Sequence, residues 1–347
     1  MSTDIPGLKD DLDVSPDFIA PPEPAPLILE FKDNRLLSEV FGAQDKHLTI
    51  IENKLGVSTV GRGNKILITG PTSKRHIAAQ VLRDLYGVVQ SGRQVGKAEV
   101  EAALRMSGNS EDGVNPEPRF SLGDESMQVN LRRRRIGPRN PAQAKYIEAL
   151  KRDELVFGIG PAGTGKTYLA VAVAVSMLVE GKVDRLILSR PALEAGERLG
   201  FLPGDMREKV DPYLRPLYDA LHDMFTAEQI ERKLEAGEIE VAPLAFMRGR
   251  TLSNAYVILD EAQNCTPMQM KMFLTRLGEN SRMAVTGDPN QSDLPANSKL
   301  GLREAVEVLR GVEGVSIVRF ADADVVRHPL VKRIVGAYEN RSKNESD

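Results

Sequence analysis

The chain has 347 residues, a formal net charge of −3 and 41% hydrophobic residues, which is enough for two globular domains. The near-neutral charge excludes a globally basic nucleic-acid-binding protein, so a surface for polyanions must be local. The single cysteine, Cys265, excludes a disulfide framework, and no apolar run approaches the ~18 residues of a membrane span. The N-terminus also lacks the pattern of a signal peptide. We therefore expect a cytoplasmic protein that makes no membrane contact.

The chain begins with a polar segment followed by a small domain. Residues 1–26 are acidic and rich in proline, a composition that predicts a disordered tail. Residues 27–106 are predicted to form a small α+β domain. Its predicted elements are, in order, a strand over 27–31, helices over 35–41 and 46–54, a hairpin of strands 57–60 and 65–69, and a helix over 73–85.

This order of elements resembles the KH-type small RNA-binding domains, whose Gly-x-x-Gly turn clamps the nucleic-acid backbone. Gly42-Ala43-Gln44-Asp45 stands where that turn is expected, with Asp45 in place of the second glycine. A carboxylate at this position repels phosphate. RNA binding through the turn and a simple docking role for a KH-like domain both remain open.

A second domain follows a polar connection. Residues 107–130 have the composition of a flexible linker, and four consecutive arginines, Arg132 to Arg135, come directly after it. Such a run is either a solvated face or a contact for a polyanion. From residue 131 to 340 strand and helix patterns alternate, which predicts an α/β domain with a parallel sheet. Residues 341–347 are expected to be a second disordered tail.

The most specific motif is a complete phosphate-loop pattern, G-x-x-x-x-G-K-[ST]. It consists of Gly160, Pro161, Ala162, Gly163, Thr164, Gly165, Lys166 and Thr167. A buried-strand pattern over 155–159 precedes it and an apolar helix pattern follows it, so the backbone N–H groups would form an anion nest at a helix N-terminus. We expect Lys166 to reach the β- and γ-phosphates and the Thr167 hydroxyl to bind Mg²⁺. The pattern therefore predicts a protein that binds a nucleoside triphosphate.

Two further strand ends carry the polar residues that hydrolysis needs. Asp260 follows the apolar run Tyr256–Leu259, so it is placed to hold Mg²⁺, and Glu261 can orient or deprotonate the attacking water. Thr266, Pro267 and Gln269 then predict a capped helix start. After a strand over 282–286, Gln291 is the best candidate for sensing the γ-phosphate, because an amide can bond both water and phosphate.

The identity of the base is predicted by a residue upstream of the loop. Gln143 lies just before the helix that leads into the phosphate loop, and a glutamine can pair with both N6 and N7 of adenine. No Asn-Lys-x-Asp segment that reads guanine is present. ATP is therefore the expected nucleotide, although Gln143 could also be an ordinary helix residue.

The phosphate loop, Asp260–Gln263, Gly287–Gln291 and Gln143 together resemble the first RecA-like domain of superfamily 1 helicases. The similarity to the PhoH-like ATPases is closer, because that family also carries the runs 188–204, 211–219, 242–252 and 324–331. The resemblance implies a RecA-like P-loop NTPase domain. It also implies work on RNA and the ribosome with an endoribonuclease partner. Some family members carry a PIN nuclease domain, but the N-terminal part shows no matching set of acidic ligands, so we do not expect nuclease activity.

The arginine that neutralises charge on the γ-phosphate is the least determined part of the site. Arg327 is the first candidate, because it begins a helix after the predicted strand 315–320, and Arg190 is the second. Arg215, Arg248 and Arg250 could instead reach a neighbouring subunit, and each of these arginines could be a salt-bridged scaffold residue. The glycine-rich stretch Glu194–Gly204 is expected to be a mobile loop at the position where superfamily 1 motors contact single strands.

The expected activity is an ATPase that couples hydrolysis to RNA remodelling or unwinding. Only one RecA-like domain is predicted, so a motor would need a homo-oligomer in which a neighbour completes each site. The alternative is an ATP-gated switch that binds RNA or protein without translocation. A kinase is disfavoured, because Asp260, Glu261 and the Gly287–Gln291 segment suit the activation of water.

Overall fold

The computed structural model describes residues 25–108, 122, 124, 127–131, 135–191, 206–295, 298–326, 330, 331 and 334. Some predicted features lie outside these residues, namely the tail up to residue 24, most of the linker, Arg132 to Arg134, the loop Glu194–Gly204, Arg327 and the tail 341–347. In the part of the chain that is described, no helix is both long enough and apolar enough to cross a membrane.

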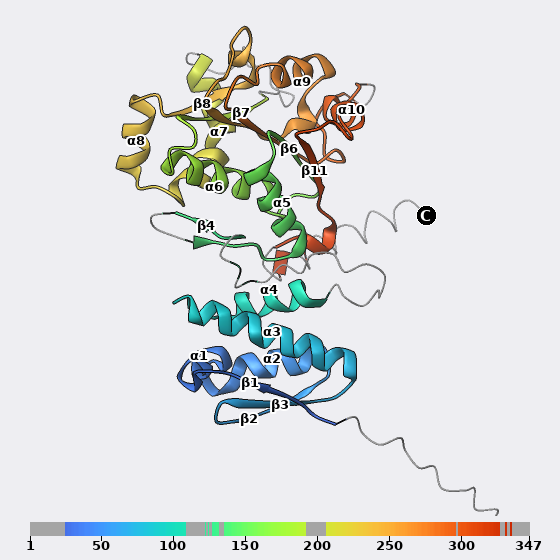
Figure 1. The fold of residues 1–347 in the computed structure, drawn as a ribbon. Coiled ribbons are helices and arrows are strands. Elements are labelled where there is room, and N and C mark those ends of the chain that lie inside the picture. The colour runs from blue at the N-terminus through green and yellow to red at the C-terminus, as the bar shows by residue number, and fades with distance from the viewer. Residues whose placement is uncertain are drawn as a thin grey trace, which may run out of the picture.

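The small N-terminal domain is built on a three-stranded antiparallel sheet with the order β1-β3-β2. Its strands are β1 (Leu27–Glu30), β2 (Ser58–Arg62) and β3 (Lys65–Thr69). Its helices are α1 (Leu37–Phe41), α2 (Lys46–Leu55), α3 (Thr72–Gln90) and α4 (Lys97–Gly108). The helices lie on one side of this sheet (Figure 1). The predicted small α+β region is therefore confirmed.

Two features of the small domain differ from the sequence prediction. Helix α3 continues five residues past its predicted end, because Val88 and Val89 are buried in the domain core and their packing outweighs the helix cost of Gly87. Helix α4 was not predicted at all. Val100 and Ala103 are fully buried in the same core, which explains why this short amphipathic segment is helical.

The predicted turn at Gly42–Asp45 is present between α1 and α2. Gly42, Gln44 and Asp45 have φ angles of 72°, 55° and 54°, a left-handed stretch that side chains rarely adopt. A Cβ atom on Gly42 would lie 2.7 Å from the His47 ring, so only glycine fits there. The turn therefore has a strained backbone, and part of this strain lies at Asp45, a non-glycine residue with a positive φ.

The larger domain contains a six-stranded sheet with the order β11-β6-β10-β9-β7-β8, and all of its strand pairs are parallel. Its strands are β6 (Leu155–Ile159), β7 (Arg185–Arg190), β8 (Ile239–Pro243), β9 (Ala255–Leu259), β10 (Arg282–Gly287) and β11 (Val315–Arg319). The predicted α/β domain with a parallel sheet is confirmed. Because β10 separates β6 from β9, the loops after all three strands meet at one edge of the sheet.

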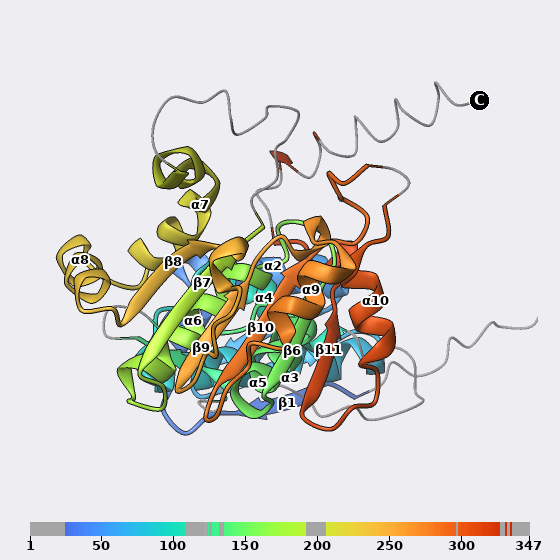
Figure 2. The same ribbon diagram turned by 90° about the horizontal axis from the view of Figure 1, so that it is seen from above.

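Helices cover both faces of this sheet (Figure 2). They are α5 (Pro141–Arg152), α6 (Lys166–Val179), α7 (Met206–His222), α8 (Ala227–Glu235), α9 (Pro267–Leu274) and α10 (Gly301–Val308). Neighbouring residues of β6 point to opposite faces, so Val156 packs with α5 and α6 while Phe157 packs with α9 and α10. Helix α6 is apolar all round and almost wholly buried, which anchors the end of the phosphate loop.

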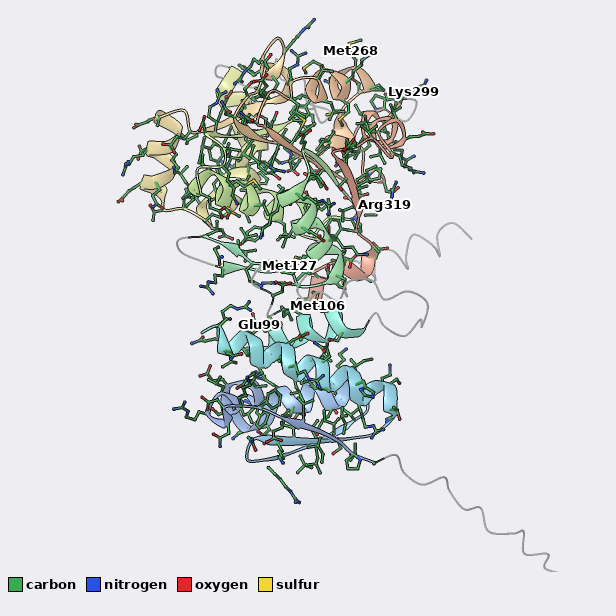
Figure 3. All side chains as sticks on the ribbon, viewed as in Figure 1. Glu99, Met106, Met127, Met268, Lys299 and Arg319 are labelled. Carbon is green, nitrogen blue, oxygen red and sulfur yellow. The ribbon has the colours of Figure 1, made fainter. Side chains whose placement is uncertain are left out.

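Helices α3 and α4 lie between the small sheet and the larger domain (Figure 1). Glu99 and Met106 on α4 face the larger domain, with Met127 across from them (Figure 3). Met127 precedes a short hairpin of strands β4 (Val129–Asn130) and β5 (Arg135–Ile136). A hydrogen bond crosses between the domains, from Arg105 Nε to the Arg139 carbonyl at 3.1 Å. The small domain therefore contacts the segment that leads into α5.

Candidate nucleotide site

The phosphate loop connects the carboxyl end of β6 to the start of α6. Lys166 is mostly buried, and its ammonium donates hydrogen bonds to the carbonyls of Gly160 at 2.6 Å and Pro161 at 2.8 Å. The Thr164 hydroxyl donates to the same Pro161 carbonyl at 2.9 Å. The loop is thus closed on itself by its own side chains. Its positive charge lies at the N-terminus of α6, where the first N–H groups have no partner within the helix.

Two glycines of the loop have a positive φ, and at Gly160 a close contact also excludes any side chain. Gly160 has a φ of 142°, and a Cβ atom there would lie 2.3 Å from the Phe320 carbonyl oxygen. Gly165 has a φ of 86°, and its Cβ atom would lie 3.1 Å from Gln143 Nε2. Any other residue at Gly160 would push the loop away from β11, so these glycines give the backbone the close curvature of a phosphate cradle.

The residues predicted to hold Mg²⁺ lie together. The Thr167 hydroxyl donates to Asp260 Oδ1 at 2.6 Å, and the Thr286 hydroxyl donates to the same oxygen at 2.7 Å. Thr286 lies on β10, between β6 and β9, and its hydrogen bond fixes the position of the Asp260 carboxylate. No group of three or more His, Cys, Asp or Glu side chains that could hold a metal occurs among the described residues. One carboxylate and one hydroxyl, completed by phosphate oxygens and water, are nevertheless a donor set that Mg²⁺ accepts.

Glu261 is held between two side chains. Its Oε1 atom is 3.0 Å from Arg190 Nη2, and its Oε2 atom accepts a hydrogen bond from Gln263 Nε2. The Glu261 backbone has a φ of 52°, a left-handed conformation that turns the chain sharply after β9. Gln263 is 3% exposed, and its Oε1 atom accepts from the Asp288 N–H at 3.1 Å. The position of this carboxylate is therefore set by three strand ends.

Gln291 lies at the turn that follows β10. Its backbone N–H donates to the Asp288 carbonyl at 3.0 Å, and its side chain is exposed. Asp288 is itself buried and is linked to Gln263, as described above. The turn therefore has a fixed attachment to the Glu261 side of the site, while the Gln291 amide is free to meet solvent or a ligand.

Gln143 is buried and joins the phosphate loop to the segment before α5. Its Nε2 atom donates to the Thr164 carbonyl at 2.8 Å, and its Oε1 atom accepts from the Arg139 N–H at 2.8 Å. The Asn140 side chain caps the helix by accepting from the Gln143 N–H. The amide retains one hydrogen and one lone pair for a base. The position is thus more than an exposed helix residue, because Gln143 supports the loop directly.

The arginine candidates differ in their surroundings. The Val326 N–H donates to the Gly163 carbonyl at 2.9 Å, so the chain touches the phosphate loop one residue before Arg327. Arg190 pairs with Glu261, and Arg250 makes a two-pronged ion pair with Glu240 at 2.6 and 2.7 Å. The Glu240 carboxylate raises the pKa of the Arg250 guanidinium. Arg215 and Arg248 are exposed.

Cys265 is fully buried in the core on the side of the sheet covered by α9 and α10. Burial raises the pKa of the Cys265 thiol to about 12, which fits an inert core residue.

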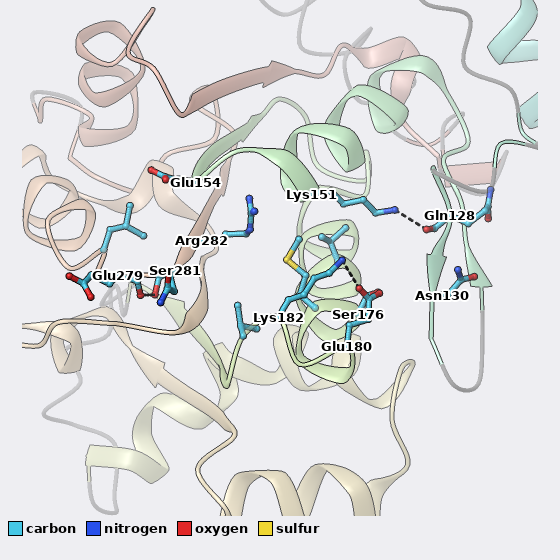
Figure 4. A pocket seen from close by; sticks show the side chains of 16 residues that line it. Gln128, Asn130, Lys151, Glu154, Ser176, Glu180, Lys182, Glu279, Ser281 and Arg282 are labelled. Atoms are coloured by element: carbon cyan, nitrogen blue, oxygen red, sulfur yellow. Dashed lines mark hydrogen bonds and ion pairs between the residues drawn. The ribbon is translucent and has the colours of Figure 1, made fainter.

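A cavity of about 770 Å³ lies at the end of the sheet opposite the phosphate loop, beside Glu154 and Arg282 at the amino ends of β6 and β10 (Figure 4). Its charges are largely matched, as in the pair of Lys182 with Glu180. Ligands of parallel sheets bind at the carboxyl ends, so we do not assign the nucleotide to this cavity.

Comparison with known proteins decides the family. The family model described as "PhoH-like protein" matches residues 135–339. The chain belongs to the PhoH-like protein family. The "PhoH-like protein" of Bacillus subtilis is 50% identical over 303 residues, which cover 87% of this chain and 94% of the relative. "Protein PhoH" of Escherichia coli is 46% identical over 264 residues, which cover 72% and 75%.

One solved structure, the "Sulfolobus solfataricus SWI2/SNF2 ATPase core in complex with dsDNA", covers 42% of this chain and 31% of that chain, with 20% identity and a TM-score of 0.29. This similarity carries no argument about function. The PhoH-like match assigns the chain to a P-loop NTPase family, in agreement with the phosphate loop and the parallel sheet described above. Nucleotide binding and the NTPase class thus rest on the family.

Two supporting residues, Thr286 and Gln263, were not assigned a role from the sequence, and they hold the two carboxylates. Arg190 was predicted as either a phosphate partner or a salt-bridged scaffold residue, and the structure pairs it with Glu261. A sequence signal for Thr286, Gln263 and Arg190 was present, because each lies at or just after the carboxyl end of a predicted buried strand. Sequence spacing does not show which of these ends are neighbours, since that depends on the strand order.

Proposed function

We propose that this PhoH-like protein is an Mg²⁺-dependent ATPase that couples hydrolysis to RNA remodelling or unwinding. The observation that carries the ATPase part is the 2.6 Å contact between Thr167 and Asp260, with Glu261 one residue further along the chain. The RNA part, and work in ribosome maturation with an endoribonuclease partner, follow from the resemblance to the PhoH-like ATPases.

Each residue of the loop has a defined task in this mechanism. Lys166 and the N–H groups at the start of α6 bind the β- and γ-phosphates and keep the terminal phosphate in line for attack. Thr167 and Asp260 would hold Mg²⁺, which when bound supplies positive charge to the phosphate oxygens. Lys166 exchanges its contacts with the Gly160 and Pro161 carbonyls for phosphate oxygens.

Glu261 acts on the attacking water. Its carboxylate orients the water and accepts its proton, while Arg190 and Gln263 hold the two carboxylate oxygens in place. Gln291 senses the γ-phosphate from the turn after β10, and Arg327 neutralises charge on the transferred phosphoryl group. The contact of Val326 with Gly163 supports the assignment of Arg327, because it brings the preceding residue to the loop.

Gln143 selects ATP over GTP through its remaining hydrogen and lone pair. RNA contacts come from Arg132 to Arg135 and from the loop Glu194–Gly204, while the Gly42–Asp45 turn contributes little because Asp45 repels phosphate. Arg135, the described member of the run, is exposed, which fits this role. Among the described residues there is one parallel sheet, so translocation along RNA requires a homo-oligomer whose neighbouring subunit completes each site.

The presence of one parallel sheet among the described residues also favours a second candidate function, an ATP-gated switch that binds RNA or protein without translocation. Native mass measured with and without a non-hydrolysable ATP analogue separates the two. A closed oligomer with RNA-stimulated ATP hydrolysis supports the motor. A persistent monomer with slow turnover, whose affinity for RNA changes with the bound nucleotide, supports the switch.

A further inference from the structure

A cavity of about 1070 Å³ lies between the two domains, directly beside the phosphate loop. The small domain contributes the connector between α3 and α4, including Gln94, and the first turn of α4 with Ala98. The larger domain contributes Arg139, Gly165 and Tyr168. The cavity is comparable in size to the pockets that proteins use for small ligands, typically about 300–1,000 Å³.

The cavity lies on a different side of the phosphate loop from Lys166, Asp260 and Glu261. Gly163, Gly165 and Tyr168 line it, whereas Lys166, Asp260 and Glu261 do not. In a phosphate loop the lysine and the metal ligand serve the terminal phosphates, while the backbone holds the inner phosphates. A triphosphate bound with its terminal phosphate near Asp260 therefore needs room for its nucleoside on another side of the loop. The interdomain cavity provides that room.

The wall formed by the small domain is held firmly in place. Arg93 Nη2 donates to the Leu122 carbonyl at 2.8 Å, and the Glu99 carboxylate accepts from the Gly96 N–H at 2.9 Å. These contacts fix the connector on both sides of Gln94. Gln94 itself is exposed, and its amide can both donate and accept hydrogen bonds. A braced wall with a free amide suits a ligand that has apolar faces and polar edges, such as a base with its ribose.

A continuous series of hydrogen bonds connects this wall to the loop. Arg105 on α4 donates to the Arg139 carbonyl at 3.1 Å, and the Arg139 N–H donates to Gln143 Oε1 at 2.8 Å. Gln143 Nε2 then donates to the Thr164 carbonyl in the phosphate loop at 2.8 Å. The small domain and the phosphate loop are thus joined by three consecutive contacts through two residues.

We propose that the nucleoside part of the bound nucleotide lies in this interdomain cavity, so that the small domain forms one wall of the nucleotide site. This inference rests on the proposed ATPase function, because it takes the phosphate loop as the site of the triphosphate. It gives the small domain a role in nucleotide binding that is separate from any contact with RNA.

The test compares ATP with inorganic tripolyphosphate, which has the phosphates but no nucleoside. In the full chain, Ala98→Trp places a large side chain in the cavity at an exposed position of α4, and Ala236→Trp makes the same change at an exposed position outside it. We expect Ala98→Trp to weaken ATP binding by at least about tenfold and to leave tripolyphosphate binding unchanged. Ala236→Trp should change neither. Thermal unfolding of both variants checks that they are folded.

Photolabelling provides a second, independent measurement on the unaltered chain. A photoreactive ATP with its azide on the base should label a peptide within residues 88–102. Labelling only elsewhere, or an Ala98→Trp variant that binds ATP as the wild type does, overturns the proposal, and so does equal loss of both ligands by folded Ala98→Trp. Failure of the ATPase proposal has a different signature, because Lys166→Ala would then still bind both ATP and tripolyphosphate.

Discussion

Arg190 and Glu261 form an ion pair with an N–O distance of 3.0 Å, although 70 positions separate them in the chain. Arg190 ends β7 and Glu261 follows β9, and these two strands are neighbours in the sheet. The pair is partly shielded from solvent, since the two side chains are 21% and 37% exposed. The ion pair restrains Glu261, the carboxylate proposed to orient the attacking water, through the guanidinium of Arg190 on the adjacent strand.

Glu261→Gln should retain ATP affinity and slow turnover by about 100-fold or more, because an amide cannot accept the proton of water. The amide is the same size and keeps one oxygen for Arg190. Asp260→Asn provides the contrast, because it should weaken the dependence of ATP binding on Mg²⁺. Steady-state hydrolysis and equilibrium ATP binding measure the two effects. An undiminished hydrolysis rate in Glu261→Gln would show that another group activates the water.

Arg190→Ala should lower kcat by roughly tenfold while KM for ATP stays close to that of the wild type, because Glu261 keeps its contact with Gln263 but loses one of its two restraints. Arg190→Lys should restore part of the rate, since lysine keeps the charge but not the planar geometry. A rise in KM with unchanged kcat would contradict a role in positioning Glu261. It would point instead to direct contact with the nucleotide.

Gln143→Ala should reduce the preference for ATP over GTP and weaken the binding of both nucleotides. The first effect tests the pairing with adenine, and the second follows from the lost hydrogen bond to Thr164. Leaving that carbonyl without its partner should also lower the free energy of unfolding by about 1–3 kcal/mol. Hydrolysis rates with each nucleotide and thermal unfolding give both quantities. Equal use of ATP and GTP by the wild type would exclude adenine recognition altogether.

Replacement of Arg132 to Arg135 by alanine should weaken RNA binding and flatten its salt dependence, because each lost phosphate contact removes about 0.7 from the log–log slope for single strands. Basal ATP hydrolysis should change less than RNA binding, and any change is attributed to Arg135, which lines the interdomain cavity. A control variant removes the same charge from four exposed arginines elsewhere, Arg62, Arg83, Arg232 and Arg310. If the run variant matches the wild type at every salt concentration, the arginines are a solvated segment.

Asp45→Gly should stabilise the small domain by roughly 0.5–1 kcal/mol, because a glycine relieves the left-handed backbone at φ 54°. RNA binding should stay unchanged or become slightly tighter, since a carboxylate is removed from the turn. Thermal unfolding and RNA titration measure the two effects. A loss of RNA affinity would show that Asp45 contributes to recognition through its own hydrogen bonds.

The sequence predicted those parts of the molecule whose signal is local. Gly160–Thr167 forms a loop between strand and helix, and Thr266, Pro267 and Gln269 cap α9 as expected. Asp260 lies at the end of a fully buried strand, also as predicted. These features depend on neighbours in the chain, so pattern and chemistry are sufficient to find them.

The unpredicted parts depend on contacts between distant segments. Helix α4 has an amphipathic pattern but is short, and it is stabilised by the burial of Val100 and Ala103 in the small-domain core. The role of Thr286 required the position of β10 between β6 and β9, and the link from Arg105 to Arg139 required the placement of the two domains. Strand order and domain placement are properties of the whole chain, so a sequence pattern alone does not determine them.

The contact of Gly160 with Phe320 has a consequence for the protein while it is being synthesised. β11 is the last strand of the sheet to be made, and without it β6 is an edge strand whose five residues are all apolar or glycine. A nascent chain that has not reached residue 320 therefore exposes an unpaired strand of the type that aggregates. Until then the phosphate loop that follows β6 also lacks its contact with Phe320. The edge of β6 is therefore covered only when the last strand of the sheet has been made.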